Sequence, residues 1–152
     1  MKFELTIASL LTVTCLGATA LLAGTPEQEK AFTEKYKTAF EAKDTATLES
    51  FLYTKDANPM ALDFYKMMLT EGAGGKISKI ELVDLSPEDA KKAGEAQEGP
   101  GGTKVQMPLK PTKKLKMTVE TKDANGSSSS TSESFIAEKD GKFVIPVPVA
   151  AK

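Results

Sequence analysis

The chain has no histidine and no tryptophan, and its 20 basic residues are all lysines, so it has no arginine either. Without histidine, it lacks the one side chain that titrates near neutral pH in an ordinary environment. Histidine-based zinc sites, Ser-His-Asp triads and Cys-His dyads are therefore excluded within this chain. Without arginine, a bidentate clamp on a carboxylate or phosphate is excluded too. Any chemistry must use Asp, Glu, Lys, Tyr, Ser or Thr.

Cysteine is almost absent. The only one is Cys15, in the amino-terminal segment, so the rest of the chain forms no internal disulfide and depends on its apolar core for stability. Of the 152 residues, 40% are hydrophobic and 27% are charged, which is the composition of a globular domain. The formal net charge of −1 implies no general attraction to nucleic acid, and none is expected as a partner.

The first two dozen residues have the features of a targeting segment. Lys2 gives a positive start, and residues 5–23 carry no charge. A helix of that length would be about 28 Å long, which is just enough to cross a bilayer. The small residues of Ala18-Thr19-Ala20 match the pattern that signal peptidase requires. We therefore interpret residues 1–24 as a signal peptide and residues 25–152 as one exported domain, periplasmic or secreted.

Two other interpretations of this segment remain open. The leader can stay uncleaved and anchor the domain, which is the one case in which contact with a membrane is expected. The chain can also be a lipoprotein attached through Cys15, although Thr12 and Thr14 match a lipoprotein signal poorly. Within the signal-peptide interpretation, cleavage after Ala23 is the weaker option because Leu21 occupies the position three residues before the cut.

The first half of the domain is predicted to be helical. Thr25-Pro26-Glu27-Gln28 has the composition of a capping box with proline in the first turn. Phe32, Tyr36 and Phe40 then recur every four residues, which predicts one amphipathic helix over residues 26–43.

Two more helices follow in this half. Asp44 is a suitable N-cap for a short helix that turns Leu48, Phe51 and Leu52 inward. Asn58-Pro59 starts a third helix that extends to about Thr70, and the glycines at 72, 74 and 75 end it.

The second half is predicted to form strands. The alternating segments cover residues 77–85, 105–109, 115–119, 127–139 and 143–145. The first of them slips once in its alternation, which indicates a bulge, and Pro108 and Pro111 place the second at a sheet edge. Ser86-Pro87 starts a short helix, and Asn125-Gly126 and Asp140-Gly141 are turn signals. The predicted fold is α+β, with the amino-terminal helices packed on a curved, mostly antiparallel sheet of about four to five strands.

Two segments resemble the nuclear-transport-factor-like superfamily, which includes ketosteroid isomerases and SnoaL-like proteins. Residues 36–44, Tyr-Lys-Thr-Ala-Phe-Glu-Ala-Lys-Asp, with Leu48, Phe51, Leu52 and Asp56 beyond them, resemble its opening helix and turn. Residues 135–143, Phe-Ile-Ala-Glu-Lys-Asp-Gly-Lys-Phe, resemble its closing hairpin. The resemblance implies a cone-shaped, cystatin-like fold: a curled sheet around a long helix, with a pocket at the wide end. It implies no single activity, since this fold carries enzymes, binding modules and interaction domains.

Tyr36, Tyr53, Asp63 and Tyr65 are the candidates for acid–base catalysis. A carboxylate and a phenol in a dry pocket can transfer and stabilise a proton. Packing in the apolar stripe is the other explanation for Tyr36, and solvation on the helix surface is the other explanation for Asp63. No metal ligand set and no cofactor are expected.

Met60, Phe64, Met67 and Met68 lie on one side of the third predicted helix and are the candidates for an adaptable apolar ligand site. Ordinary core packing is the alternative explanation of such a stripe.

Two polar segments have ordinary explanations. The lysines at 110, 113, 114 and 116 could meet anionic lipid or polymer, but alternating lysines are typical of the solvated face of a strand. The polar run over residues 127–132 is interpreted as the solvated start of a strand.

Three functions are compatible with these observations. The leading hypothesis is a non-catalytic exported domain that binds a small apolar ligand or a partner protein at the open end of the cone. The second is a general acid–base enzyme of the isomerase or dehydratase type. The third is a structural or inhibitory module that acts through its sheet surface. Ligand identity and oligomeric state stay open.

Overall fold

The computed structural model describes residues 24–124 and 126–152. The predictions that concern residues 1–23, namely the leader, its cleavage site and Cys15, lie outside the described residues, as does Asn125 of the predicted turn. Over the described residues the fold is α+β, as predicted, and the elements follow nearly the predicted order.

Helix α1 (Pro26–Glu41) begins where its capping residues predict. The Thr25 side chain accepts a hydrogen bond from the backbone N–H of Gln28 (3.3 Å), and the Gln28 side chain accepts one from the N–H of Thr25 (2.9 Å). These bonds satisfy amide groups that the first turn leaves free. The helix ends at Glu41 rather than at Lys43, because Lys43 adopts a positive φ of 56°, which is incompatible with a continuing helix.

The shorter helices also begin at capping side chains. They are α2 (Thr45–Glu49), α3 (Pro59–Thr70) and α4 (Pro87–Gly94), with a short 3-10 turn η1 (Pro100–Gly102). Asp44, Asn58 and Ser86 each accept a hydrogen bond from the backbone N–H three residues later. The predicted starts of these helices are therefore confirmed, because each start depends on a local cap.

The larger sheet is mixed. In spatial order its strands are β1 (Leu52–Tyr53), β7 (Lys142–Pro146), β6 (Gly126–Lys139), β5 (Lys113–Asp123) and β2 (Lys76–Asp84). β1 runs parallel to β7, and the other neighbours are antiparallel. A mostly antiparallel sheet is thus confirmed for the described residues, and it contains four of the predicted strands together with β1. β1 escapes prediction because two residues show no periodicity.

A smaller, separate sheet contains β3 (Gln97–Glu98), β4 (Lys104–Gln106) and β8 (Val149–Ala150). The strand predicted over residues 105–109 is therefore wrong in its extent, since it ends at Gln106 and belongs to this second sheet. Pro108 and Pro111 explain the early end, because proline has no N–H to donate to a ladder.

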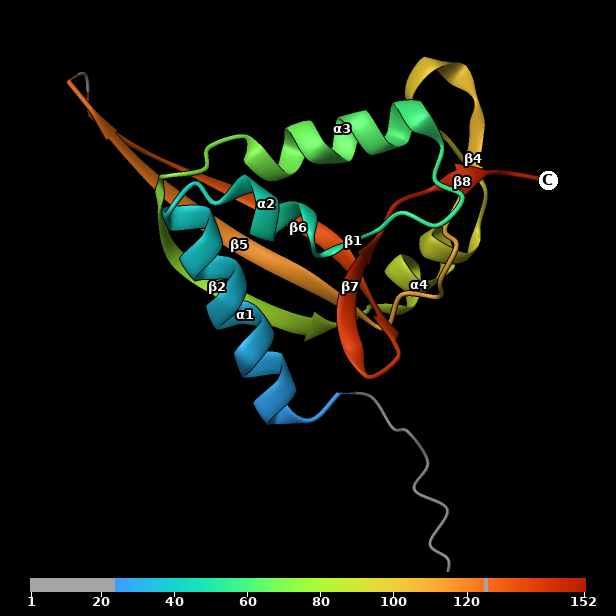
Figure 1. Cartoon of the computed structure of the whole chain (residues 1–152), viewed down its shortest axis with the longest axis horizontal. Coiled ribbons are helices and arrows are strands. Elements are labelled where there is room, and N and C mark those ends of the chain that lie inside the picture. The colour runs from blue at the N-terminus through green and yellow to red at the C-terminus, as the bar shows by residue number, and fades with distance from the viewer. Residues whose placement is uncertain (1–23, 125) are drawn as a thin grey trace, which may run out of the picture.

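The helices cover one side of the larger sheet. Figure 1 shows α1, α2 and α3 in front of the strands, with the β5–β6 hairpin extending beyond them and α4 beside the smaller sheet. The largest fully buried side chains come from helices, strands and the segment after β7: Phe40, Leu48, Ile77, Ile136, Ile145, Pro146 and Val147. The core thus lies between the helical layer and one face of the sheet.

The slip in the alternation of β2 is confirmed as a change of register. Ile77 pairs with Val119 and Lys79 pairs with Thr118, so Ser78 is the extra residue. Beyond it, Ile80 pairs with Met117 on the core side, and alternation continues.

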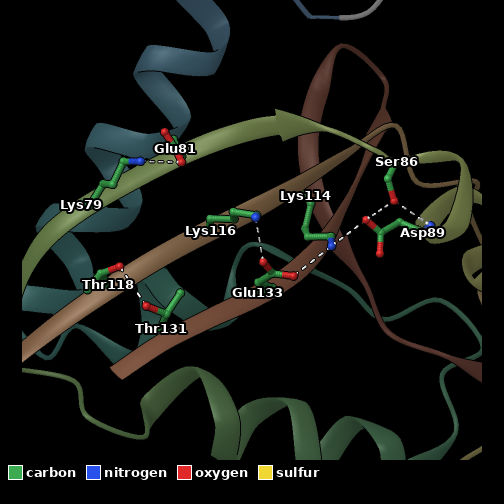
Figure 2. A network of polar contacts seen from close by, with 9 residues as sticks. All are labelled: Lys79, Glu81, Ser86, Asp89, Lys114, Lys116, Thr118, Thr131 and Glu133. Carbon is green, nitrogen blue, oxygen red and sulfur yellow. Dashed lines mark hydrogen bonds and ion pairs between the residues drawn. The ribbon is translucent and has the colours of Figure 1, made fainter. Parts of the chain in front are cut away.

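The face of the sheet away from the helices carries ion pairs, which Figure 2 shows. The ammonium of Lys114 lies 2.7 Å from a carboxylate oxygen of Asp89 and 2.9 Å from one of Glu133, and Lys116 lies 3.0 Å from Glu133. The Ser86 hydroxyl donates to Asp89 (2.8 Å). Lys114 and Lys116 do face away from the core, and the carboxylates of Asp89 and Glu133 neutralise them.

The pair between Lys114 and Asp89 joins strand β5 to the first turn of α4. We expect Lys114→Met to loosen α4 and to make its amide hydrogens exchange roughly two- to fivefold faster, because exposed ion pairs contribute modestly. Hydrogen-exchange mass spectrometry over residues 87–94 measures this. Lys30→Met is the matched control, since Lys30 pairs with Glu34 inside α1. Equal exchange in α4 for wild type and Lys114→Met would contradict the expectation.

Candidate functional site

A cleft of about 380 Å³ opens between helices α1 and α3 and the helix-facing side of strands β5 and β6. Its apolar wall consists of Tyr36, Met68, Leu69, Met117 and Val119. Strands β5 and β6 extend past the helices (Figure 1), so this part of the inner face of the sheet is not fully covered. The volume lies in the range of pockets that take one small molecule.

The part of the sheet that lies beside Met117 and Val119 in the cleft is polar. Ser130, Ser132 and Ser134 of β6 line it. They pair with Val119, Met117 and Leu115 of β5, whose side chains are buried, so these serines project from the same, helix-facing side of the sheet. Serine is small and its hydroxyl both donates and accepts a hydrogen bond. The wall therefore leaves space and offers hydrogen bonds along one line.

Tyr36 contributes a phenol to the cleft. The residue is 3% exposed, and burial raises the pKa of its hydroxyl to about 12. Desolvation penalises the phenolate, so the group stays neutral across the physiological range and can donate a hydrogen bond. Its ring stacks on the ring of Phe40, with 6.4 Å between the ring centroids, and contacts the ring of Phe51, with 5.5 Å between the centroids. These contacts hold the Tyr36 ring in place.

The structure divides the four candidate ligand residues into two groups. Met68 lines the cleft. Met60, Phe64 and Met67 are instead exposed on the outer side of α3, at 53%, 43% and 59% of their surface. Phe64 and Met68 are one helical turn apart, so the exposed stripe adjoins the edge of the cleft.

The candidate acid–base residues are not brought together. Tyr36 lines the cleft, whereas Asp63 is exposed on α3, and Tyr65 packs against the core from the same helix. Burial raises the pKa of Tyr65 as well. Tyr53 lies in β1 beside a different hollow that Val149 and Ala150 also line. Among the described residues, Glu71 is the one carboxylate that lines the cleft.

A second hollow, of about 540 Å³, lies over the glycine-rich turn between α3 and β2. Lys43, Lys76 and Lys122 line it, together with residues 72–75 and 120–121. All three lysines are exposed, so the walls of this hollow are charged and solvated. The smaller cleft is the better candidate site, because buried apolar side chains such as Tyr36, Leu69 and Met117 shape it.

Within the part of the chain that the structure describes, no group of three or more His, Cys, Asp or Glu side chains lies close enough to hold a metal ion. The helices in that part are also too short or too polar to cross a membrane.

Comparison of the chain with models of protein families, with curated proteins and with solved structures finds no match. The nuclear-transport-factor-like resemblance therefore stays a prediction from the two sequence segments described above.

Sequence reasoning missed most of the cleft wall. Ser130 and Ser132 fell in the segment interpreted as a solvated strand start, Met117 and Val119 belonged to the alternating strand over residues 115–119, and Leu69 was not singled out. The signal that could have identified them is the pairing of β6 with β5, since alternate serines then face the same side as the apolar residues of β5.

Proposed function

We propose that this chain is a binding domain that takes a small, neutral, amphipathic molecule in the cleft. The ligand would place an apolar body against Met68, Leu69 and Met117 and hydrogen-bonding groups against the β6 serines. The observation that carries the proposal is the mixed lining of one cleft: apolar side chains from α1, α3 and β5 surround a line of three hydroxyls on β6.

The neutral phenol of Tyr36 supports the same class of ligand. A hydrogen-bond donor in the wall of a largely apolar cleft favours a ligand that can accept its hydrogen bond. The three polar side chains of the β6 wall are uncharged, so the cleft offers no strong attraction to an ion there. Ligand sites that are mostly apolar, with a few placed polar groups, are the common form of small-molecule pocket.

The cone-like fold is part of the proposal. A sheet with helices on its inner side and a cleft at the uncovered end agrees with what the nuclear-transport-factor-like resemblance implies. In that architecture the wide end of the cone is the ligand entrance. An exported location, periplasmic or secreted, belongs to the proposal as well, because it depends on the leader alone.

The test is a comparison of two phenylalanine substitutions in the same strand. Ser132→Phe places a benzyl group in the middle of the cleft, and we expect it to weaken binding of the neutral dye N-phenylnaphthylamine by at least about tenfold. Ser129→Phe is the matched control, because Ser129 pairs with Glu120 and does not line the cleft. Fluorescence titration measures the affinity of each purified variant.

Circular dichroism and thermal melts verify that both variants fold. If Ser132→Phe folds and binds the dye as the wild type does, the cleft is not the binding site. A direct complement is solvent extraction of the purified wild-type protein followed by mass spectrometry, which identifies a carried-over ligand. A ligand recovered equally from Ser132→Phe would contradict the proposal in the same way.

A further inference from the structure

Strand β2 forms one edge of the larger sheet, with β5 as its only strand partner in the described part of the chain (Figure 1). The Glu41 carboxylate accepts the N–H of Ile77 at 3.0 Å. Outside the ladder with β5, the backbone of residues 78–84 makes no hydrogen bond to any other described residue. A strand edge of this kind offers a row of backbone donors and acceptors to another strand.

The charges along this edge are arranged almost symmetrically. Residues 76–84 read Lys-Ile-Ser-Lys-Ile-Glu-Leu-Val-Asp, with the basic residues before Ile80 and the acidic residues after it. When two copies of this strand align antiparallel with Ile80 opposite Ile80, Lys79 of each copy lies opposite Glu81 of the other. Lys76 then lies near the acidic end of the second copy. The edge is therefore complementary to itself.

The directions in which the side chains of β2 project agree with this antiparallel alignment. Lys79 and Glu81 pair with Thr118 and Lys116 of β5, so both project from the sheet face away from the helices. Their side chains are 67% and 39% exposed, and they lie 2.9 Å apart in the single chain. Both charges are therefore available to a second strand.

The core-facing side of the strand gains contact in the same alignment. Ile80 and Leu82 are only partly buried against the core of a single chain. A second copy would bring its own Ile80 opposite this Ile80, which removes apolar surface from water.

We infer that β2 pairs with β2 of a second copy of this chain, antiparallel and around a twofold axis, so that one sheet continues through both subunits. Such an interface uses the same surface on both partners, which is the common form of a closed dimer. Parallel pairing in register would place Lys79 beside Lys79 and Glu81 beside Glu81, and like charges directly opposite each other oppose it. The charges thus select the antiparallel arrangement.

The dimer should be weak. The bulge at Ser78 interrupts the strand, so with Ile80 opposite Ile80 the uninterrupted pairing covers only residues 79–81 of each copy. Lysines and bulges at an edge limit pairing with unrelated strands. An interface of this length falls below the usual size of a stable complex, and we expect a Kd between about 10 µM and about 1 mM.

Sedimentation velocity of the purified full chain, with its leader as the cell leaves it, measures this over about 1 µM to about 1 mM. Lys79→Glu or Glu81→Lys alone places like charges opposite each other at both pairs, and each should weaken dimerisation roughly tenfold. The double exchange, Lys79→Glu with Glu81→Lys, restores opposite charges and should restore the dimer. Lys91→Glu on α4 is the matched control for net charge.

The most discriminating experiment mixes the two single variants. Neither variant can form the Lys79–Glu81 ion pair within its own chain. A mixed dimer would nevertheless place opposite charges at both pairs: Glu at 79 opposite Lys at 81 in one pair, and the unchanged Glu81 opposite the unchanged Lys79 in the other. We therefore expect the mixture to associate more tightly than either variant alone. Hydrogen exchange of residues 78–84 should slow as the wild-type concentration rises, because the free amides become bonded.

Three results would overturn the inference. The first is a wild-type chain that stays monomeric up to about 1 mM. The second is association that none of the charge reversals changes, which would assign it to another surface or to the leader. The third is a mixture that associates no better than its components. The cleft proposal does not depend on any of these outcomes.

Discussion

Phe40→Ala is expected to lower the free energy of unfolding by about 3 to 5 kcal/mol, the cost of removing a buried aromatic side chain and leaving a cavity. Phe40 is almost fully buried, and its ring stacks on that of Tyr36 with 6.4 Å between the ring centroids. Its backbone carbonyl also accepts the N–H of Gly74 at 2.8 Å, which joins α1 to the turn before β2. The side chain therefore packs at the junction of helix and sheet, where neighbours on both sides limit any collapse into the cavity.

Urea unfolding followed by circular dichroism measures this loss. Domains of this size are stable by about 5 to 15 kcal/mol, so the variant should retain only part of its stability and unfold at much lower urea. Met67→Ala is the matched control: it also truncates a large apolar side chain, but one that is 59% exposed. We expect it to change stability by less than about 0.5 kcal/mol. Similar losses in both variants would contradict the described core.

Raising the pH from about 10 to about 12 is expected to remove about 2 kcal/mol of stability through Tyr36 alone. The pKa of this phenol is about 12 in the folded protein, because burial disfavours the phenolate, against a value of 10.0 for a free tyrosine. Between these values the unfolded chain has released the proton and the folded chain still holds it. The unfolded state then binds fewer protons, so stability falls as the pH rises. Below about pH 10 the two states hold the same proton and the effect vanishes.

Guanidinium unfolding at about pH 9 and at about pH 11.5 measures the loss. Tyr36→Phe is the control, since it keeps the ring and removes the ionising group. Every other ionisable group is the same in both proteins, so the difference between wild type and Tyr36→Phe isolates Tyr36. A loss of equal size in both proteins would show that burial does not raise the pKa of the Tyr36 hydroxyl.

The parts of the fold that depend on local chemistry could be predicted from the sequence. Helix starts at Thr25, Asp44, Asn58 and Ser86 follow from side chains that cap the next turn, and all four are confirmed. The bulge at Ser78 is visible as a slip in alternation and is confirmed by the register with β5.

Elements that depend on distant pairing could not be predicted. β1 exists because Leu52 and Tyr53 pair with Ile145 and Pro146 near the other end of the chain. β8 likewise depends on pairing with β4.

The orientation of β6 also needed its partner strand. Ile136 is buried in the core, whereas Phe135 pairs with Lys114 on the outer face. Residues 135–137 are all apolar, so the pattern alone does not fix which of them points inward.

The candidate site could likewise be predicted only in part, because its lining depends on contacts between distant segments. Methionines and an aromatic residue at helical spacing marked α3 as apolar, but spacing does not reveal which part of an apolar stripe is covered. The sheet approaches α3 on the side of Met68 and Leu69 and leaves Met60, Phe64 and Met67 in water. The serines of β6 form a cleft wall only because pairing with β5 turns alternate ones inward.

By itself, the sequence determined the α+β class, the helix caps, the bulge and the exclusion of histidine, arginine and disulfide chemistry from the domain. Each of these depends on residues a few positions apart or on composition. Tertiary structure alone decided the cleft, the burial of the Tyr36 phenol and the open edge of β2. These features arise where segments distant in sequence meet or fail to meet, and the free energy of those contacts depends on packing that no local pattern encodes.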